Sequence, residues 1–311
     1  MALWEHYHLP SSVDEALSLL MRYAGQARVV AGGTDLILEL QQGRRAPVEA
    51  LVDVTRVAEM TRIEEADGYF NVGAAVTHTA IVASELLAQK ATCLVESCGV
   101  IGGPQVRNVA TLGGNVAHAL PAGDGTLSLI ALDAEAEVAS PLQSPVAKFH
   151  VRREWRPVQS LFKRPGESEV DQTRQVIVRF RFKPAGPHEA TAFKRVMRPQ
   201  GVALPILGMA AWLRLNGNLV EDVRIALGPA GPTPMRAYKA ESYLAGIPLV
   251  EEVIPQIADL ILAEATLRTS RHRATAEYRR EMIEVLVRRA LTLAYRRAQT
   301  GEVVSEGVGM G

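Results

Sequence analysis

Two glycine-rich stretches hold the residues of this sequence that are best suited to bind another molecule. Paired glycines let the main chain approach a ligand closely, because no Cβ stands in the way. Successive backbone N–H groups turned into one concavity form a nest for an anion such as a pyrophosphate. The first stretch consists of Val29, Val30, Ala31, Gly32, Gly33, Thr34, Asp35 and Leu36, and the second contains Thr111, Leu112, Gly113, Gly114 and Asn115.

The two stretches favour a bound phosphate group without identifying its carrier. For either stretch alone, a plain glycine turn between two strands is the alternative interpretation. The chain contains neither G-x-G-x-x-G nor G-x-x-x-x-G-K-[ST], and Gly123, Gly125 and then Ser128 is a near miss to the first of these motifs. The pattern therefore predicts that a nucleotide-like anion binds, but it does not identify which one.

A longer resemblance includes the same residues. The segments VVAGGTDL and PQVRNVATLGGNVAHALPAGD resemble the FAD-binding subunit of the molybdenum hydroxylases. That family includes xanthine dehydrogenases, aerobic carbon monoxide dehydrogenases and related aldehyde and N-heterocycle dehydrogenases. The resemblance implies an α+β protein with a two-lobed FAD-binding domain of the vanillyl-alcohol-oxidase/PCMH type. A smaller α+β C-terminal domain, with a three-stranded sheet and helices, would follow it.

The resemblance also implies how the two stretches would act. Both would wrap the pyrophosphate and adjoining sugar of FAD, chiefly through backbone N–H groups. Thr34, Thr111 and Asn115 could add side-chain hydrogen bonds. In the first loop this chain has Thr34-Asp35 where some relatives have Gln-Ser, which leaves the side-chain contacts there open.

Four residues outside these loops are implied as further contacts. Asp124 would accept from ribose or ribityl hydroxyls, although a plain turn residue between two glycines is the alternative interpretation. Ile101 and Val178 match apolar positions near the flavin. Lys194 matches a lysine that approaches the isoalloxazine ring, where it could stabilise negative charge on the reduced flavin.

The implied function is electron transfer. Electrons would reach FAD from two 2Fe–2S clusters in a small partner subunit, and a large partner subunit with the molybdenum cofactor would hydroxylate the substrate. A dimer of heterotrimers is implied, with NAD⁺, a quinone or dioxygen as the final acceptor. This chain itself would hold no catalytic residue and no metal. The alternatives are a stand-alone FAD oxidase or reductase of the same flavin fold, and a flavin-free nucleotide-binding scaffold.

Composition excludes other classes of protein. The 311 residues include 34 Lys and Arg and 34 Asp and Glu, so the formal charge is zero and a sequence-independent nucleic-acid binder is disfavoured. No apolar run reaches the length of a membrane span, and no secretory signal is visible at the N-terminus. The two cysteines, Cys93 and Cys98, are too few for a disulfide framework and are expected as buried thiols. These features favour the cytoplasm.

Periodicity and turn signals divide the chain into predicted units. Residues 1–57 form the N-terminal lobe, 58–183 the second lobe, 188–300 the C-terminal domain and 301–311 a loose tail. Within them we expect a helix capped by Ser12, strands at 28–31, 50–54 and 176–182, helices at 35–42 and 77–87, and a hairpin turn at Asn216-Gly217. The last helix, 278–298, is expected to expose Arg288, Arg289, Arg296 and Arg297 to solvent, with a partner-binding face as the alternative interpretation.

Overall fold

The first lobe is built on a small parallel sheet. The computed structural model describes residues 2–142, 150–198, 204–271 and 273–305. The lobe runs β1 (His6–His8), α1 (Val13–Arg22), β2 (Ala27–Val30), α2 (Leu36–Gln41) and β3 (Ala50–Asp53), with strand order β1-β3-β2. The Ser12 hydroxyl accepts a hydrogen bond from the Glu15 N–H at 3.1 Å, so the predicted helix cap is confirmed. Because β2 ends at Val30, the first glycine stretch forms the loop into α2.

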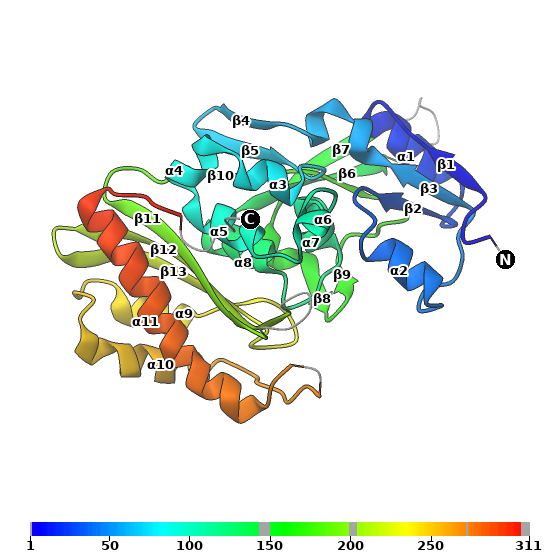
Figure 1. The fold of residues 1–311 in the computed structure, drawn as a ribbon. Coiled ribbons are helices and arrows are strands. Elements are labelled where there is room, and N and C mark those ends of the chain that lie inside the picture. Colours follow the sequence, from blue (N-terminus) through cyan, green and yellow to red (C-terminus); the bar gives the residue numbers. More distant parts are fainter. Residues whose placement is uncertain (1, 143–149, 199–203, 272, 306–311) are drawn as a thin grey trace.

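The second lobe is an antiparallel sheet interrupted by a group of helices. Its strands lie in the order β4-β5-β10-β6-β7, and the helices α3 to α8 all come between β5 and β6 in the chain (Figure 1). The predicted strand at 176–182 is observed with those bounds. The elements are β4 (Ile63–Ala66), β5 (Tyr69–Gly73), α3 (His78–Val82), α4 (Glu85–Lys90), α5 (Thr92–Gly99), α6 (Pro104–Arg107), α7 (Leu112–Ala117), α8 (Asp124–Ala131), β6 (Glu135–Leu142), β7 (His150–Pro157), the short pair β8 (Phe162–Arg164) and β9 (Glu167–Ser168), and β10 (Val176–Phe182).

The single helix predicted at 77–87 is two helices. The Ser84 hydroxyl accepts from the Leu87 N–H at 3.3 Å, and this cap starts α4. A serine side chain in a helix interior competes with the backbone hydrogen bonds of the helix. At the N-cap it instead accepts from a backbone N–H that would otherwise have no partner. The apolar pattern continues across the break, which is why periodicity alone predicted one helix.

The C-terminal domain has a four-stranded antiparallel sheet in the order β11-β12-β13-β14, where three strands were expected. The additional strand, β14, is two residues long and pairs with Ala226 and Leu227. A strand this short, next to a Gly/Pro-rich loop, has no periodicity that the sequence could reveal. The elements are β11 (Glu189–Met197), β12 (Pro205–Asn216), β13 (Leu219–Gly228), β14 (Met235–Arg236), α9 (Tyr238–Leu244), α10 (Ile254–Leu262) and α11 (Ala276–Thr300).

The C-terminal sheet is covered on both faces. Helix α11 packs across β11 and β12 on one face, while α5 and α8 of the second lobe pack against β11, β12 and β13 on the other (Figure 1). Phe193, Ala210, Trp212 and Ala226 therefore belong to the core of the FAD-domain lobes rather than to the core beneath α11. Strand alternation explains this division, since successive residues of β11 point to opposite faces. The C-terminal domain is thus fixed against the second lobe.

The predicted domain boundaries fall between observed elements. Residue 57 lies between β3 and β4, and residues 184–187 lie between β10 and β11.

Every helix within the described ranges is too short or too polar to span a lipid bilayer. The same residues contain no group of three or more His, Cys, Asp or Glu side chains arranged to hold a metal ion.

The two cysteines lie on α5 and are fully buried, which confirms the prediction of buried thiols. Burial raises the pKa of Cys93 to about 12 and raises the pKa of Cys98 as well. The thiolate is the reactive form, so we expect the native protein to resist thiol reagents and to react at both positions only after unfolding. Titration with a chromogenic disulfide reagent, before and after denaturant is added, measures this. Rapid labelling of the native chain would contradict the buried placement.

Candidate functional site

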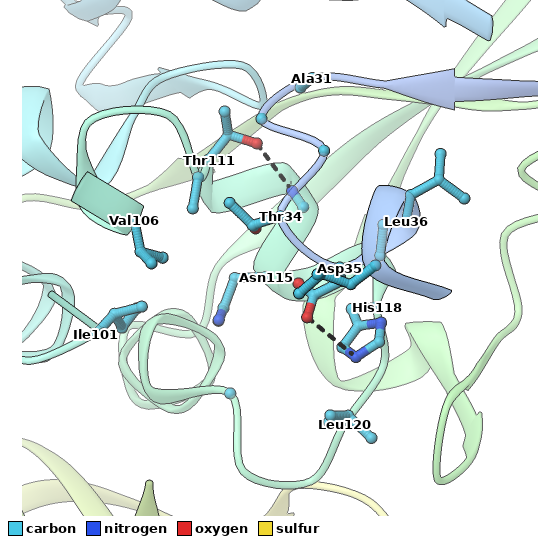
Figure 2. Close-up of a pocket in the computed structure, with 18 of the residues that line it drawn as sticks. Ala31, Thr34, Asp35, Leu36, Ile101, Val106, Thr111, Asn115, His118 and Leu120 are labelled. Carbon is cyan, nitrogen blue, oxygen red and sulfur yellow. Dashed lines mark hydrogen bonds and ion pairs between the residues drawn. The ribbon is translucent and has the colours of Figure 1, made fainter. Parts of the chain in front are cut away.

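The two glycine stretches meet at one place in the structure. The loop after β2 lies against the segment that precedes α7, and both face the same cavity (Figure 2). The contact is backbone to backbone: a Cβ added at Gly32 would lie 2.1 Å from the carbonyl oxygen of Val109. Gly33 adopts a φ of +68°, which L side chains rarely tolerate. Both glycines of the first stretch are therefore required by the geometry of this junction.

The cavity has a volume of about 500 Å³ and is bounded by all three parts of the chain. The N-terminal lobe contributes the first glycine stretch together with Leu38, Glu39 and Arg45. The second lobe contributes the wall from Ile101 to Asp124. The C-terminal domain closes it with Arg195, Leu204, Pro205 and Arg273.

The first glycine loop presents backbone hydrogen-bond donors to the cavity, whereas the N–H groups of residues 112–115 in the second stretch already donate to acceptors within the protein. Among the described residues, the backbone N–H groups of Gly32, Gly33, Thr34 and Asp35 have no hydrogen-bond partner. Thr111 caps α7 by accepting from the Gly114 N–H at 3.1 Å. The side-chain oxygen Oδ1 of Asn115 accepts hydrogen bonds from the N–H and the hydroxyl of Thr126, so its amide nitrogen is left as a further donor at the cavity wall (Figure 2).

A buried ion pair lies in the cavity wall between the second lobe and the C-terminal domain. Asp124 Oδ2 is 2.6 Å from Arg195 Nη1, and the two side chains are 4% and 5% exposed. Burial raises the pKa of Asp124 to about 6, and the positive charges of Arg195 and Arg273 oppose this shift. Asp124 Oδ1 and Arg195 Nε have no partner among the described residues.

The cavity wall also carries a histidine beside two carboxylates. His118, just after α7, lies 3.6 Å from Asp35 (Figure 2). It also lies 3.8 Å from Glu39, which like Asp35 belongs to the N-terminal lobe. These contacts join the first glycine loop and α2 to the second lobe. Sequence reasoning placed Asp35 in the loop but gave no signal for His118.

His78 is a second histidine at the cavity, and it is 1% exposed. Its Nδ1 has no partner in the described structure, and burial, with the charge of Arg107, lowers its pKa to about 4. The unfolded chain therefore binds a proton between pH 6.5 and about 4 that the folded chain excludes. Stability from the neutral ring is complete above pH 6.5 and is lost as the pH falls through this window.

We expect His78→Gln to flatten the acid side of the stability profile. The wild-type protein should lose on the order of 3 kcal/mol of unfolding free energy through this one group as the pH falls from about 7 to about 4. Urea unfolding at a series of pH values measures the loss, with the exposed His150→Gln as the matched control. A His78→Gln profile as steep as the wild type would show that another group causes the acid dependence.

The structure brings most of the predicted contact residues together. Thirteen predicted residues line the cavity: Val29, Val30, Ala31, Gly32, Gly33, Thr34, Asp35, Leu36, Ile101, Thr111, Gly114, Asn115 and Asp124. Residues of both glycine stretches therefore lie around one cavity, and their contacts with a cofactor stay a prediction.

The other four predicted residues lie away from the cavity wall. Leu112 and Gly113 are buried behind the loop, where a Cβ at Gly113 would lie 2.6 Å from Ala74. Val178 is a fully buried core residue of β10. Lys194 lies in a separate hollow beside α11, on the face of β11 opposite to Arg195. Because strand side chains alternate, one position along β11 decides which face a residue meets.

Sequence reasoning missed several residues that complete the cavity. They include His78, His118, Arg195 and Arg273, which come from four separate segments. His118 lies inside the long segment PQVRNVATLGGNVAHALPAGD and Arg195 directly follows the matched Lys194, but neither residue was singled out, and His78 and Arg273 have no motif around them. Only their meeting in space distinguishes them.

These features fit a dinucleotide such as FAD. The unpartnered N–H groups of the first loop suit a pyrophosphate, which needs several fixed donors and little bulk nearby. The unpartnered atoms of Asp124 and Arg195 suit a polar group at the other end of the cavity, since buried polar atoms ordinarily have a partner. The volume lies within the range of ligand sites of this kind.

Two protein families match this chain, one over its two N-terminal lobes and one over its C-terminal domain. The profile of the FAD binding domain in molybdopterin dehydrogenase matches residues 3–182, and that of the CO dehydrogenase flavoprotein C-terminal domain matches residues 191–294. The chain is 30% identical over 294 residues to the xanthine dehydrogenase FAD-binding subunit of Escherichia coli O157:H7, covering 93% of this chain and 95% of that one. It is also 30% identical to the carbon monoxide dehydrogenase medium chain of Hydrogenophaga pseudoflava, covering 94% and 97%.

Solved structures show the same fold. Carbon monoxide dehydrogenase from Hydrogenophaga pseudoflava superposes with a TM-score of 0.84 at 28% identity, covering 94% of this chain and 98% of that one. Quinoline 2-oxidoreductase from Pseudomonas putida 86 gives a TM-score of 0.82 at 25% identity, with the same coverage. The FAD-binding domain family matches more than half of this chain. The chain therefore belongs to the FAD-binding medium subunits of the molybdopterin dehydrogenase family, which are oxidoreductase flavoproteins.

Proposed function

We propose that this chain is the electron-transfer flavoprotein subunit of a molybdenum hydroxylase complex. The observation that carries the proposal is the meeting of two distant glycine loops around one cavity, where the N–H groups of the first loop have no partner among the described residues. Main-chain donors of this kind bind a diphosphate without an excess of positive side chains. We assign the FAD-binding domain to the vanillyl-alcohol-oxidase/PCMH type.

The residues of the chain have distinct parts in holding the cofactor. The loop Ala31–Asp35 would hold the diphosphate, with Thr34, Thr111 and Asn115 as side-chain donors from both lobes. Asp124 would accept a hydrogen bond through its unpartnered Oδ1, and Ile101 would give an apolar contact. Bound FAD would supply the redox chemistry, because a flavin takes up electrons singly or in pairs.

The partners in this proposal supply the other steps. A small subunit with two 2Fe–2S clusters would deliver electrons, and a large subunit with the molybdenum cofactor would hydroxylate the substrate. The assembly would be a dimer of heterotrimers in the cytoplasm. NAD⁺, a quinone or dioxygen would be the final acceptor. Relatives named as medium chains of carbon monoxide and glyceraldehyde dehydrogenases and as the medium subunit of nicotine 6-hydroxylase support the role of this chain. Because their substrates differ, the substrate of this complex has to be found by experiment.

Isolation of the native complex tests the proposal. We expect a yellow protein that absorbs near ~450 nm through bound flavin, together with iron, molybdenum and two further chains. Assays with purines, aldehydes, carbon monoxide and N-heterocycles, each with NAD⁺, a quinone and dioxygen, would identify the substrate and the acceptor. Turnover of a substrate by this chain alone would favour a stand-alone oxidase or reductase. A colourless protein that binds no added FAD would favour a flavin-free scaffold.

A further inference from the structure

The two cationic residues Lys194 and Arg195 are neighbours on β11, yet they lie in different environments. Arg195 points to the same side as Phe193, whose ring packs into the core shared with the second lobe. Lys194 points to the same side as Ala192, toward α11, and lines a hollow with Arg289 and Thr292 of that helix. Since side chains alternate along a strand, the two residues cannot exchange places without a shift of register.

Strand pairing fixes Arg195 at the cavity. Arg195 lies opposite Gly208 of β12, and a Cβ at Gly208 would be only 3.4 Å from Asp124 Oδ1. Glycine at this position leaves room for the carboxylate and the guanidinium to meet. The Arg195–Asp124 pair is therefore built jointly by the C-terminal domain and the second lobe.

The hydrogen bonds of Arg195 hold its guanidinium in one place. Nη1 donates to Asp124 Oδ2 at 2.6 Å, and Nη2 donates to the carbonyl oxygen of Val100, next to Ile101 in the cavity wall. Nη2 also contacts the sulfur of Met197 at 3.2 Å. Nε is buried without a partner among the described residues, as is Asp124 Oδ1. Because buried polar atoms ordinarily have a partner, this donor and this acceptor in one cavity wall favour a polar ligand group nearby.

We propose that Arg195, positioned by Asp124, is the residue that presents a fixed positive charge to the isoalloxazine ring in this chain. The inference rests on the proposed function, because it assumes that the cavity holds FAD. The glycine loops would bind the diphosphate, and the end of the cavity closed by the C-terminal domain would then take one of the two ring systems. A guanidinium at that end stabilises the negative charge that reduction adds to the flavin ring. Arg195 is thus assigned the role that the sequence resemblance gave to Lys194.

The test is a redox titration of the bound flavin in the complex as purified. The variants are Arg195→Gln, Arg195→Lys and the neighbouring Lys194→Gln as a matched loss of charge. We expect Arg195→Gln to shift the flavin midpoint potential to a more negative value, Arg195→Lys to restore it at least in part, and Lys194→Gln to leave it near that of the wild type. Flavin content and melting temperature are measured for each protein.

Each outcome decides between the roles. If Arg195→Gln loses its flavin while Lys194→Gln keeps it, an Arg195→Lys protein with flavin and a near-normal potential supports the assignment. An unchanged potential in a flavin-loaded Arg195→Gln protein overturns it, because a contact with the adenine end or a purely structural role would not move the potential. A larger shift in Lys194→Gln than in Arg195→Gln also overturns it. A wild-type complex without flavin would refute the proposed function itself.

Discussion

Gly32→Val is expected to abolish flavin binding. The Cβ of any larger residue would lie 2.1 Å from the Val109 carbonyl oxygen and 2.8 Å from the Ala110 Cα, and these are backbone atoms that cannot rotate away. The loop after β2 would have to withdraw from the second lobe, and its N–H groups would no longer converge on the site. Loss of several such donors should weaken FAD binding by two orders of magnitude or more, at about 1.4 kcal/mol for each tenfold change.

Flavin content after purification, and titration of the flavin-depleted protein with FAD, measure this effect. Gly186→Ala is the matched control, because a Cβ there meets only the Glu189 side chain at 3.7 Å and φ lies outside the left-handed region. Circular dichroism distinguishes a closed-off site from general unfolding. A folded Gly32→Val protein with full flavin occupancy would show that the first loop does not hold the cofactor.

Arg297→Met is expected to cause the largest loss of stability of any single substitution considered in this chain. Arg297 was predicted on a solvated helix face, but it is 2% exposed and its Nη2 lies 2.7 Å from Glu96 Oε1. Nη1 donates to the Thr191 carbonyl oxygen at 2.8 Å, and Nη2 also donates to that of Val304. The guanidinium thus joins α11, β11 and α5.

Removing the guanidinium leaves the carboxylate of Glu96 buried without its cation. Breaking a buried ion pair in this way typically costs about 3–5 kcal/mol, which for a chain of this size is a fall of roughly 10 °C in melting temperature. Thermal unfolding followed by circular dichroism measures the fall.

Two further variants separate the ion pair from other effects. Arg288→Met removes a cation from the same helix, but its partners Glu251 and Glu284 are exposed, so we expect a change within about 1 kcal/mol. Adding Glu96→Gln to Arg297→Met removes the stranded charge and should recover part of the loss. Equal melting temperatures for Arg297→Met and Arg288→Met would contradict a structural role for the buried pair.

The sequence by itself determined the local features of this protein. The cap at Ser12 and the strand at 176–182 follow from patterns within a few residues, and such patterns can be recognised in the sequence. The long motif around Gly113 and Gly114 also identified the family, and thirteen predicted residues lie around one cavity. The paired glycines made both loops recognisable in the sequence, although the contacts that require Gly32 and Gly113 come from Val109 and Ala74 in other segments.

Tertiary structure alone decided which side chains complete the site and the core. The alternation of β11 turns Arg195 rather than Lys194 toward the cavity, and a shift of one residue would have reversed this. Packing of α5 and α11 on opposite faces of β11 buries Arg297, although its helix position suits solvent equally well. Asp124 meets Arg195 across 71 positions of sequence. Such pairs depend on how separate helices and strands pack against one another, and this packing cannot be predicted from patterns within a few residues of sequence.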